Sequence, residues 1–159
     1  MDLTFRTGEG IFNVRVAAII VFGNKLLTLK NDLTPYYFLP GGRVKLDESA
    51  ESAIKRELKE ELDVDTKIIR PLWLVESFFY EDTTKEKFHE LCLYFLVDAS
   101  NTDLIGINKF VGKETKHHEV FEWLDISTLK DQYLYPLFIK EKIHNLPEHL
   151  EILTEYEYR

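Results

Sequence analysis

Cysteine is almost absent from this sequence, with Cys92 alone among 159 residues. One cysteine cannot form a disulfide within the chain, and its apolar neighbours at positions 91–95 predict a buried small side chain in a reducing compartment. The sequence also lacks the roughly 18 to 20 consecutive apolar residues of a membrane-spanning helix, and residues 1–4 lack the basic-then-apolar start of a signal peptide. We therefore expect a cytoplasmic protein without a membrane partner.

Basic residues are scarce relative to acidic ones, with 20 Lys and Arg against 28 Asp and Glu and a formal net charge of −8 at pH 7. Such a chain is poorly suited to a nucleic-acid polymer, because binding the phosphate backbone requires a basic face that displaces counterions. A small anionic ligand is still compatible, provided that bound metal or a few well-placed basic side chains hold its phosphates. We expect a small-molecule partner and no nucleic-acid polymer.

Glycine and proline are few, seven and five respectively, and no repeat, low-complexity tract or Pro/Gly/Ser-rich linker interrupts the chain. Hydrophobic residues make up 45% and charged residues 30%, which is typical of a globular protein and not of a disordered or fibrous one. A domain of roughly 100 to 150 residues buries a core without disulfides or structural metals. We therefore expect residues 1–159 to form a single domain.

Strand patterns recur along the chain. They are rich in β-branched and aromatic residues and are separated by turn or polar segments, which predicts two hairpins and one further strand. The first hairpin turns at Gly23-Asn24, and the second turns through the polar segment 80–87. The predicted strands cover residues 14–21, 25–30, 71–79, 88–97 and 120–124.

Helix and turn signals lie between these strands. Residues 49–62 contain no Gly or Pro and follow acidic and capping groups, which predicts a helix. Pro40-Gly41-Gly42 predicts a turn, and Pro136 is placed to open a C-terminal helix. A polar loop is expected over residues 101–116. The mixture of strands and helices predicts an α+β fold class.

The helix predicted over residues 49–62 carries acids on its core-facing side. At about 100° per residue its apolar face consists of Ala50, Ile54, Leu58 and Leu62. Glu57 and Glu61 fall on the same face, with Glu60 at its edge, and like charges four residues apart repel while burial adds a desolvation cost. A solvated acidic helix face is the alternative explanation. A hard divalent cation, Mg²⁺ or Mn²⁺, would convert the repulsion into shared coordination.

Residues around this helix also follow a fixed spacing. They are Gly42, Glu48, Arg56, Glu57, Leu58, Glu60, Glu61 and Val64, preceded by Leu39-Pro40-Gly41. The pattern Gly-x5-Glu-x7-Arg-Glu-apolar-x-Glu-Glu-x-Gly-apolar resembles the Nudix box over residues 42–64. Asp63 stands where that box has its last glycine. The glycine ends the helix with a left-handed residue, a conformation that Asp tolerates better than most residues, so we expect only a small loss of stability.

Resemblance to the Nudix hydrolases implies a fold and a reaction. The fold would be an α/β/α sandwich with a mixed central β-sheet. The reaction would be metal-dependent hydrolysis of a diphosphate bond in a nucleoside diphosphate linked to another moiety, such as an oxidised nucleoside triphosphate, a nucleotide sugar, ADP-ribose or a dinucleoside polyphosphate. The alternative is a non-catalytic Nudix-like domain that senses a nucleotide. Such domains usually lose the metal-binding glutamates and carry a fused partner domain, neither of which this sequence shows. The resemblance does not decide whether the chain forms a homodimer.

The resemblance also implies roles for individual residues of the box. The metal ligands would be Glu57, Glu60, Glu61 and the carbonyl of Gly41. Arg56 would orient a catalytic glutamate, and Glu48 would support the helix start or the outer metal shell, with Gly42 as a supporting position. These roles predict a pyrophosphohydrolase that depends on Mg²⁺ or Mn²⁺.

Residues outside the box are predicted less directly. The resemblance implies that the general base comes either from the box or from a later loop. In that loop Glu119 is favoured over Glu114, because it stands four residues before Trp123 and so resembles the acid that often comes shortly before a similar tryptophan in the family. Arg15 is a candidate phosphate or base contact, with an exposed strand charge as the alternative. The aromatic end of the strand at 71–79 offers Phe78 and Tyr80 for stacking, with core packing as the alternative. His89-Glu90 is predicted to be an edge charge.

Overall fold

The computed structural model describes residues 1–114 and 117–157, so the end of the loop expected over 101–116 lies outside the described residues. In chain order the elements are β1 (Thr4–Arg6), β2 (Ile11–Phe22), β3 (Lys25–Lys30), β4 (Gly41–Arg43), α1 (Ala50–Leu62), β5 (Lys67–Tyr80), β6 (Lys87–Asp98), β7 (Lys109–Val111), β8 (Val120–Asp125), the 3-10 helix η1 (Ile126–Asp131), α2 (Ile139–Lys142) and β9 (Glu151–Glu157).

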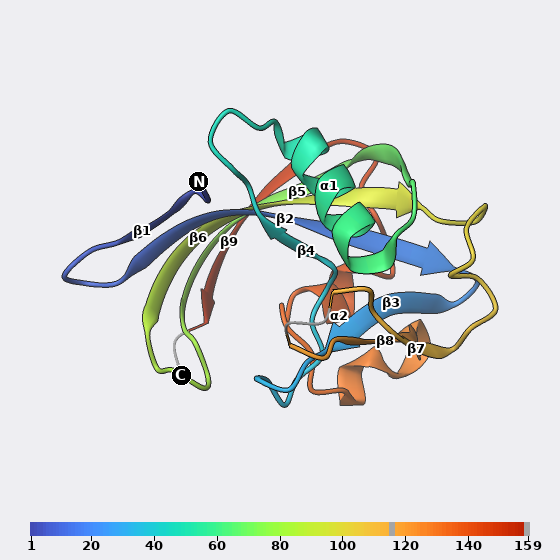
Figure 1. Cartoon of the computed structure of the whole chain (residues 1–159). Coiled ribbons are helices and arrows are strands. Elements are labelled where there is room, and N and C mark those ends of the chain that lie inside the picture. The colour runs from blue at the N-terminus through green and yellow to red at the C-terminus, as the bar shows by residue number, and fades with distance from the viewer. Residues whose placement is uncertain (115–116, 158–159) are drawn as a thin grey trace.

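The described strands form one mixed sheet, seen from one side in Figure 1. Its order is β7-β8-β3-β2-β6-β5-β9, and β1 and β4 both pair with β2. The β2–β6 and β5–β9 pairs are parallel and the other pairs are antiparallel. With helices packed on both faces, this arrangement confirms the α+β class with a mixed central sheet.

Alternation along β2 divides the core into two layers, because successive strand residues point to opposite faces. Val16, Ala18 and Ile20 pack under α1, together with Ile54 and Leu58 of that helix. On the other face, Ala17 and Ile19 pack with residues of η1 and α2. A continuous apolar run in β2 is therefore explained by burial on both sides.

Both predicted hairpins are confirmed. In the first, however, the two strands pair over only a small part of their length. β2 and β3 pair only at Val21–Leu26 and Phe22–Lys25, beside Gly23 at φ 60°. Beyond these pairs β3 continues along β8, while β2 pairs with β4 on the same side. The divergence of β2 from β3 opens the interior of the sheet next to β4.

The turn predicted at residues 40–42 is wrong, because Gly41–Arg43 forms strand β4 and pairs with β2. A β carbon on Gly41 would lie 2.1 Å from the carbonyl oxygen of Val16. Glycine is needed here because the backbones of β2 and β4 approach closely. In the sequence alone, a glycine required for close approach looks the same as a glycine required for a turn.

Helix α1 agrees with its prediction at both ends. Ser49 caps the start, and its Oγ accepts a hydrogen bond of 3.1 Å from the backbone N–H of Ser52. Asp63 ends the helix in the left-handed conformation, at φ 55° and ψ 39°, and its N–H donates to the Lys59 carbonyl. The aspartate therefore performs the backbone role expected of the missing glycine.

The C-terminal part differs most from the prediction. The helix expected to open at Pro136 begins only at Ile139 and lasts four residues, while η1 and the edge strand β9 were not predicted. Along the described part of the chain, no helix combines the length and apolar character needed to cross a bilayer.

Candidate active site

Arg56 is the centre of an ionic cluster on α1. Its Nε and Nη2 donate to the two carboxylate oxygens of Glu48 at 2.6 and 2.9 Å, and its Nη1 donates to Glu57 at 2.9 Å and to Glu60 at 3.4 Å. Its Nη2 also donates to the backbone carbonyl of Arg43 at 3.1 Å. Arg56 lowers the pKa of the Glu48 carboxyl to about 2. This bidentate pair fixes the guanidinium, which in turn fixes the position of Glu57.

The carboxyl of Glu57 lies directly against strand β4. A β carbon on Gly42 would come within 2.3 Å of that carboxyl, so any other residue at this position would displace it. Burial raises the pKa of Glu57, and Arg56 acts against the rise. The glycine thus creates the space in which the carboxylate sits beside the backbone of the Gly41–Arg43 strand.

Glu61 is the most deeply buried acid of the helix, with a relative exposure of 4%. Its Oε2 is buried and makes no hydrogen bond among the described residues. Burial raises the pKa of Glu61 to about 10, and the negative charges of Glu119 and Glu57 add to the rise. Burial likewise raises the pKa of Glu119 to about 7, with further contributions from Glu114 and Glu57. The structure therefore brings the predicted loop acids to the predicted helix acids.

These acids suit a cation that prefers oxygen ligands. A buried carboxylate oxygen without a donor, next to further carboxylates, is unfavourable until a positive charge joins it. Within residues 1–114 and 117–157, however, no three Asp, Glu, His or Cys side chains are grouped closely enough to hold a metal ion as they stand. The donor chemistry fits a divalent metal, and the ligand roles of Glu57, Glu60, Glu61 and Gly41 remain predictions.

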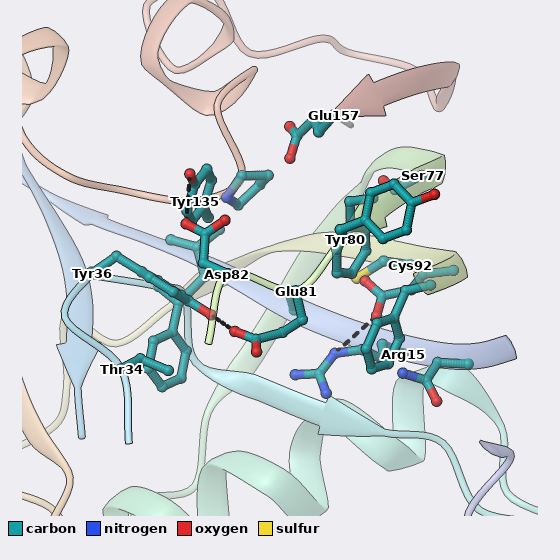
Figure 2. Close-up of a pocket in the computed structure, with 18 of the residues that line it drawn as sticks. Arg15, Thr34, Tyr36, Ser77, Tyr80, Glu81, Asp82, Cys92, Tyr135 and Glu157 are labelled. Atoms are coloured by element: carbon teal, nitrogen blue, oxygen red, sulfur yellow. Dashed lines mark hydrogen bonds and ion pairs between the residues drawn. The ribbon is translucent and has the colours of Figure 1, made fainter. Parts of the chain in front are cut away.

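A cavity of about 330 Å³ opens beside β4, on the sheet face opposite to α1 (Figure 2). Its walls come from β2, β4, β5, β6 and β9 and from the loops that follow β3, β5 and η1. Aromatic residues in the walls are Tyr36, Phe38, Phe79, Tyr80, Phe88, Tyr94 and Tyr135, and charged residues are Arg15, Arg43, Glu81, Asp82, Glu90 and Glu157. The cavity is thus apolar in its bulk with charges at defined places, as small-molecule sites usually are.

The end of the cavity formed by β2 and β4 is cationic. Arg15 and Arg43 are directly opposite each other in the β2–β4 pairing, and both side chains line the cavity. The charge of Arg15 also acts to lower the pKa of Glu57, so its guanidinium is within electrostatic reach of the helix acids. Two arginines at one end of the cavity, next to a cluster of carboxylates, suit a ligand with both phosphates and bound metal.

The opposite end holds a tyrosine cluster, Tyr36, Tyr133 and Tyr135, whose ring centroids lie 4.9 to 5.6 Å apart. The hydroxyl of Tyr36 donates to Glu81 at 3.0 Å, and those of Tyr133 and Tyr135 donate to Asp82 at 2.7 and 3.0 Å. These bonds attach the loop after β5 to the loops that follow β3 and η1. Figure 2 shows Tyr36, Glu81, Asp82 and Tyr135 gathered on one side of the cavity.

Two of the three predicted substrate contacts lie at this cavity. Arg15 and Tyr80 line it, whereas Phe78 lies elsewhere, stacked on Tyr156 at 4.9 Å and beside His89 at 4.4 Å. Phe79 points to the cavity instead, because neighbouring residues of a strand face opposite sides of a sheet. Strand alternation alone could not decide between Phe78 and Phe79 without knowing which face was open.

The predicted edge charge at Glu90 is wrong, since its side chain is only 15% exposed and lines the cavity. Other cavity residues were also missed, among them Tyr36, Arg43 and Tyr135. The sequence did contain a signal for Glu90, which shares one face of β6 with Cys92 and Tyr94. An acid on the apolar face of a strand is seldom buried without a paired charge or donor.

Comparison with known proteins gives a consistent result. The model of the NUDIX domain matches residues 12–144. The ADP-ribose pyrophosphatase of Methanocaldococcus jannaschii is 30% identical over 112 residues, covering 69% of this chain and 61% of the relative, so the chain spans less than two thirds of that protein's length.

Two solved structures share the architecture. The NUDIX hydrolase from Nitrosomonas europaea superposes with a TM-score of 0.64 at 15% identity, covering 96% of this chain and 82% of that chain. The MutT NUDIX hydrolase from Burkholderia pseudomallei gives 0.55 at 25% identity, covering 73% and 84%. The first of these likenesses concerns the fold alone.

Proposed function

Since the chain belongs to the NUDIX domain family, we propose that it is a hydrolase that cleaves a diphosphate bond in a nucleoside diphosphate linked to another group. The observation that carries this proposal is the buried Oε2 of Glu61, which has no donor among the described residues and lies within electrostatic reach of both Glu57 and the cavity arginine Arg15. A metal-bridged diphosphate would satisfy both charges, the carboxylates through the metal and the arginines through the phosphates.

Members of the family generally use divalent cations, and we propose Mg²⁺ or Mn²⁺ here. The proposed ligands are Glu57, Glu60, Glu61 and the carbonyl oxygen of Gly41. A cation at this place would neutralise non-bridging phosphate oxygens and lower the pKa of a bound water.

The chain's own residues supply positioning and proton transfer. Arg56 holds Glu57 in place through the Glu48 pair, while Arg15 and Arg43 bind the diphosphate oxygens from the cavity side. Glu119, which lies among the helix acids, is the proposed acceptor of the proton from the attacking water. Tyr80 lines the cavity that receives the organic part of the substrate.

ADP-ribose is the first substrate to test, because the relative from Methanocaldococcus jannaschii bears the name ADP-ribose pyrophosphatase. Nucleotide sugars, dinucleoside polyphosphates and oxidised nucleoside triphosphates are the other candidates. A nucleotide-sensing domain without catalysis is less favoured, since the chain keeps all three box glutamates. A single domain, a cytoplasmic location and a homodimer remain predictions.

The test is product analysis on these four substrate classes with Mg²⁺ or Mn²⁺, and again with excess EDTA. We expect ADP-ribose to yield AMP and ribose 5-phosphate in the presence of metal and to remain intact with EDTA. Binding of substrate without turnover under all metal conditions would favour the sensor. Turnover that is unchanged in excess EDTA would contradict the proposed metal site.

A further inference from the structure

An acidic side chain lies in the cavity wall where the proposed reaction does not use it. Glu90 sits on β6, opposite Asn13 in the parallel pairing with β2, and its side chain is 15% exposed. Burial raises the pKa of the Glu90 carboxyl, and the charge of Arg15 acts against the rise. Placing an acid here is unfavourable for stability, because an apolar residue would pack equally well between Phe88 and Cys92, its neighbours on this face of β6. A compensating function is therefore expected.

Glu90 has a hydrogen bond with the side chain of Asn13 and is acted on by the charges of Arg15 and Arg43. Its Oε2 lies 3.8 Å from the Nε of Arg15, which is the inner nitrogen of the guanidinium. Within residues 1–114 and 117–157, neither outer nitrogen, Nη1 or Nη2, donates a hydrogen bond, and Figure 2 shows this end of Arg15 reaching into the cavity. The carboxylate thus restrains the arginine from behind and leaves the two outer nitrogens available.

We propose that Glu90 is a positioning residue that holds Arg15 so that its two Nη groups face a diphosphate bound in the cavity. This inference rests on the proposed function. Besides Glu90, the carboxylate whose charge acts on Arg15 is Glu57 of α1. Without Glu90, Arg15 would then be drawn from the cavity toward the catalytic helix. Holding a flexible arginine in its binding geometry before the ligand arrives reduces the entropy lost on binding.

The first test is Glu90→Gln, which keeps the size of the side chain and removes its charge. We expect the KM for ADP-ribose to rise about 3- to 10-fold, which is the effect of freeing one rotamer-rich side chain, while kcat changes less than about twofold. Glu90→Asp, which keeps the charge on a shorter side chain, should recover part of the loss. The matched control is Glu76→Gln on β5, whose carboxylate bonds His89 at 2.8 Å and does not line the cavity. Both kinetic constants should stay unchanged in that variant.

A double-mutant cycle separates positioning from general damage. Arg15→Ala alone should raise KM, and adding Glu90→Gln should then change KM by less than about 1.5-fold. Independent effects of the two substitutions would overturn the proposal. Thermal unfolding of each variant is recorded in parallel. If Arg15→Ala fails to fold because Glu90 is left buried and unpaired, Arg15→Gln takes its place in the cycle.

The last arm does not depend on catalysis. Calorimetric titration with ADP in EDTA measures diphosphate binding without metal, and Glu90→Gln should raise the Kd by the same 3- to 10-fold factor only when Arg15 is present. If the protein hydrolyses none of the four substrate classes but this binding pattern holds, the proposed function fails and the role of Glu90 stands. If neither Kd nor KM responds to Glu90→Gln, the role of Glu90 is overturned.

Discussion

Two glutamates at the two ends of the site show how differently one side-chain type is treated by its surroundings. Glu81, at the tyrosine cluster, accepts hydrogen bonds from the hydroxyl of Tyr36 and from the backbone N–H groups of Thr83 and Thr84. Burial acts to raise the pKa of its carboxyl, but these donors, with the Thr83 hydroxyl, outweigh it and lower the pKa to about 2. Glu61, on α1, has an Oε2 without a donor among the described residues and a pKa raised by burial to about 10.

The difference distinguishes an acid whose charge is compensated within the fold from one that the proposed function assigns to a metal ion. Glu81 has its donors within the chain, so its negative charge is already compensated and ties neighbouring loops together. Glu61 lies near further carboxylates, so its negative charge is unfavourable as it stands and would be compensated by the proposed cation. Substitutions at the two ends should consequently affect different quantities, activity at the helix end and stability at the tyrosine end.

Among substitutions at the two ends of the site, Glu119→Gln at the helix end is expected to change activity most. If Glu119 accepts the proton of the attacking water, kcat should fall on the order of 10² to 10⁴-fold, while the affinity for metal stays unchanged. Steady-state kinetics and Mn²⁺ titration measure the two quantities. Glu114→Gln is the matched control and should keep most of its activity. A normal kcat in Glu119→Gln would return the general base to the box helix.

Glu57→Gln should lower kcat at least about 10²-fold with the fold intact, because it removes one anionic ligand at nearly constant size. In EDTA its melting temperature should hold or rise, since the substitution also relieves repulsion between carboxylates. Differential scanning calorimetry in EDTA provides the second measurement. Lower stability together with lower activity would mean that Glu57 resembles the structural acid Glu81, and the contrast between the two ends would fail.

Glu81→Gln should do the reverse and lower the free energy of unfolding by about 1 to 3 kcal/mol, because several donors lose a charged acceptor. The folded pKa of about 2 lies below the ordinary value of 4.5. The stabilising effect is therefore complete above pH 4.5 and is lost as the pH falls from 4.5 toward 2. Urea unfolding at pH 7 and pH 3 should show a smaller difference between wild type and variant at the lower pH. An equal difference at both pH values would contradict the prediction that the negative charge of Glu81 stabilises the fold.

The smallest expected effect lies at the end of α1. Asp63→Gly should raise the free energy of unfolding by about 0.5 kcal/mol, because glycine adopts the left-handed conformation without steric cost. The exposed Lys59–Asp63 pair, at 3.5 Å, contributes little that would be lost. For a chain of this size the melting temperature should rise by about 1 to 2 °C, with kcat unchanged. A decrease would mean that the aspartate side chain contributes more than its backbone conformation costs.

The parts of the site that could be predicted are local in sequence. Arg56, Glu57, Glu60 and Glu61 lie on one helix, and helix geometry alone determines that their side chains are neighbours. The left-handed end of that helix at Asp63 was predicted from the resemblance to the box, where this position usually holds glycine. The loop acid Glu119 was selected because its place before Trp123 resembles that of an acid in the family, and the structure brings it into electrostatic reach of Glu61.

The cavity could not be predicted in the same way, because its walls come from strands and loops that are far apart along the chain. Phe78 and Phe79 are equivalent in the sequence until the open face of β5 is known. Glu90 resembles a surface charge until β6 is paired with β2, which brings Asn13 and Arg15 beside it. The C-terminal helix was predicted too early because Pro136, with its fixed φ, is equally compatible with the turn that precedes Ile139.

The parallel pairing of β2 with β6 has a consequence for the order in which the molecule assembles. It joins residues 11–20 to residues 88–97, and contacts of such high sequence separation form slowly because a long loop must close first. Helix α1 and the β5–β6 hairpin need no such closure and are expected to form early. The pair of Arg15 with Glu90 spans the slow contact. We therefore expect phosphate-binding competence to develop in the last kinetic phase of refolding, after most of the helical signal has returned.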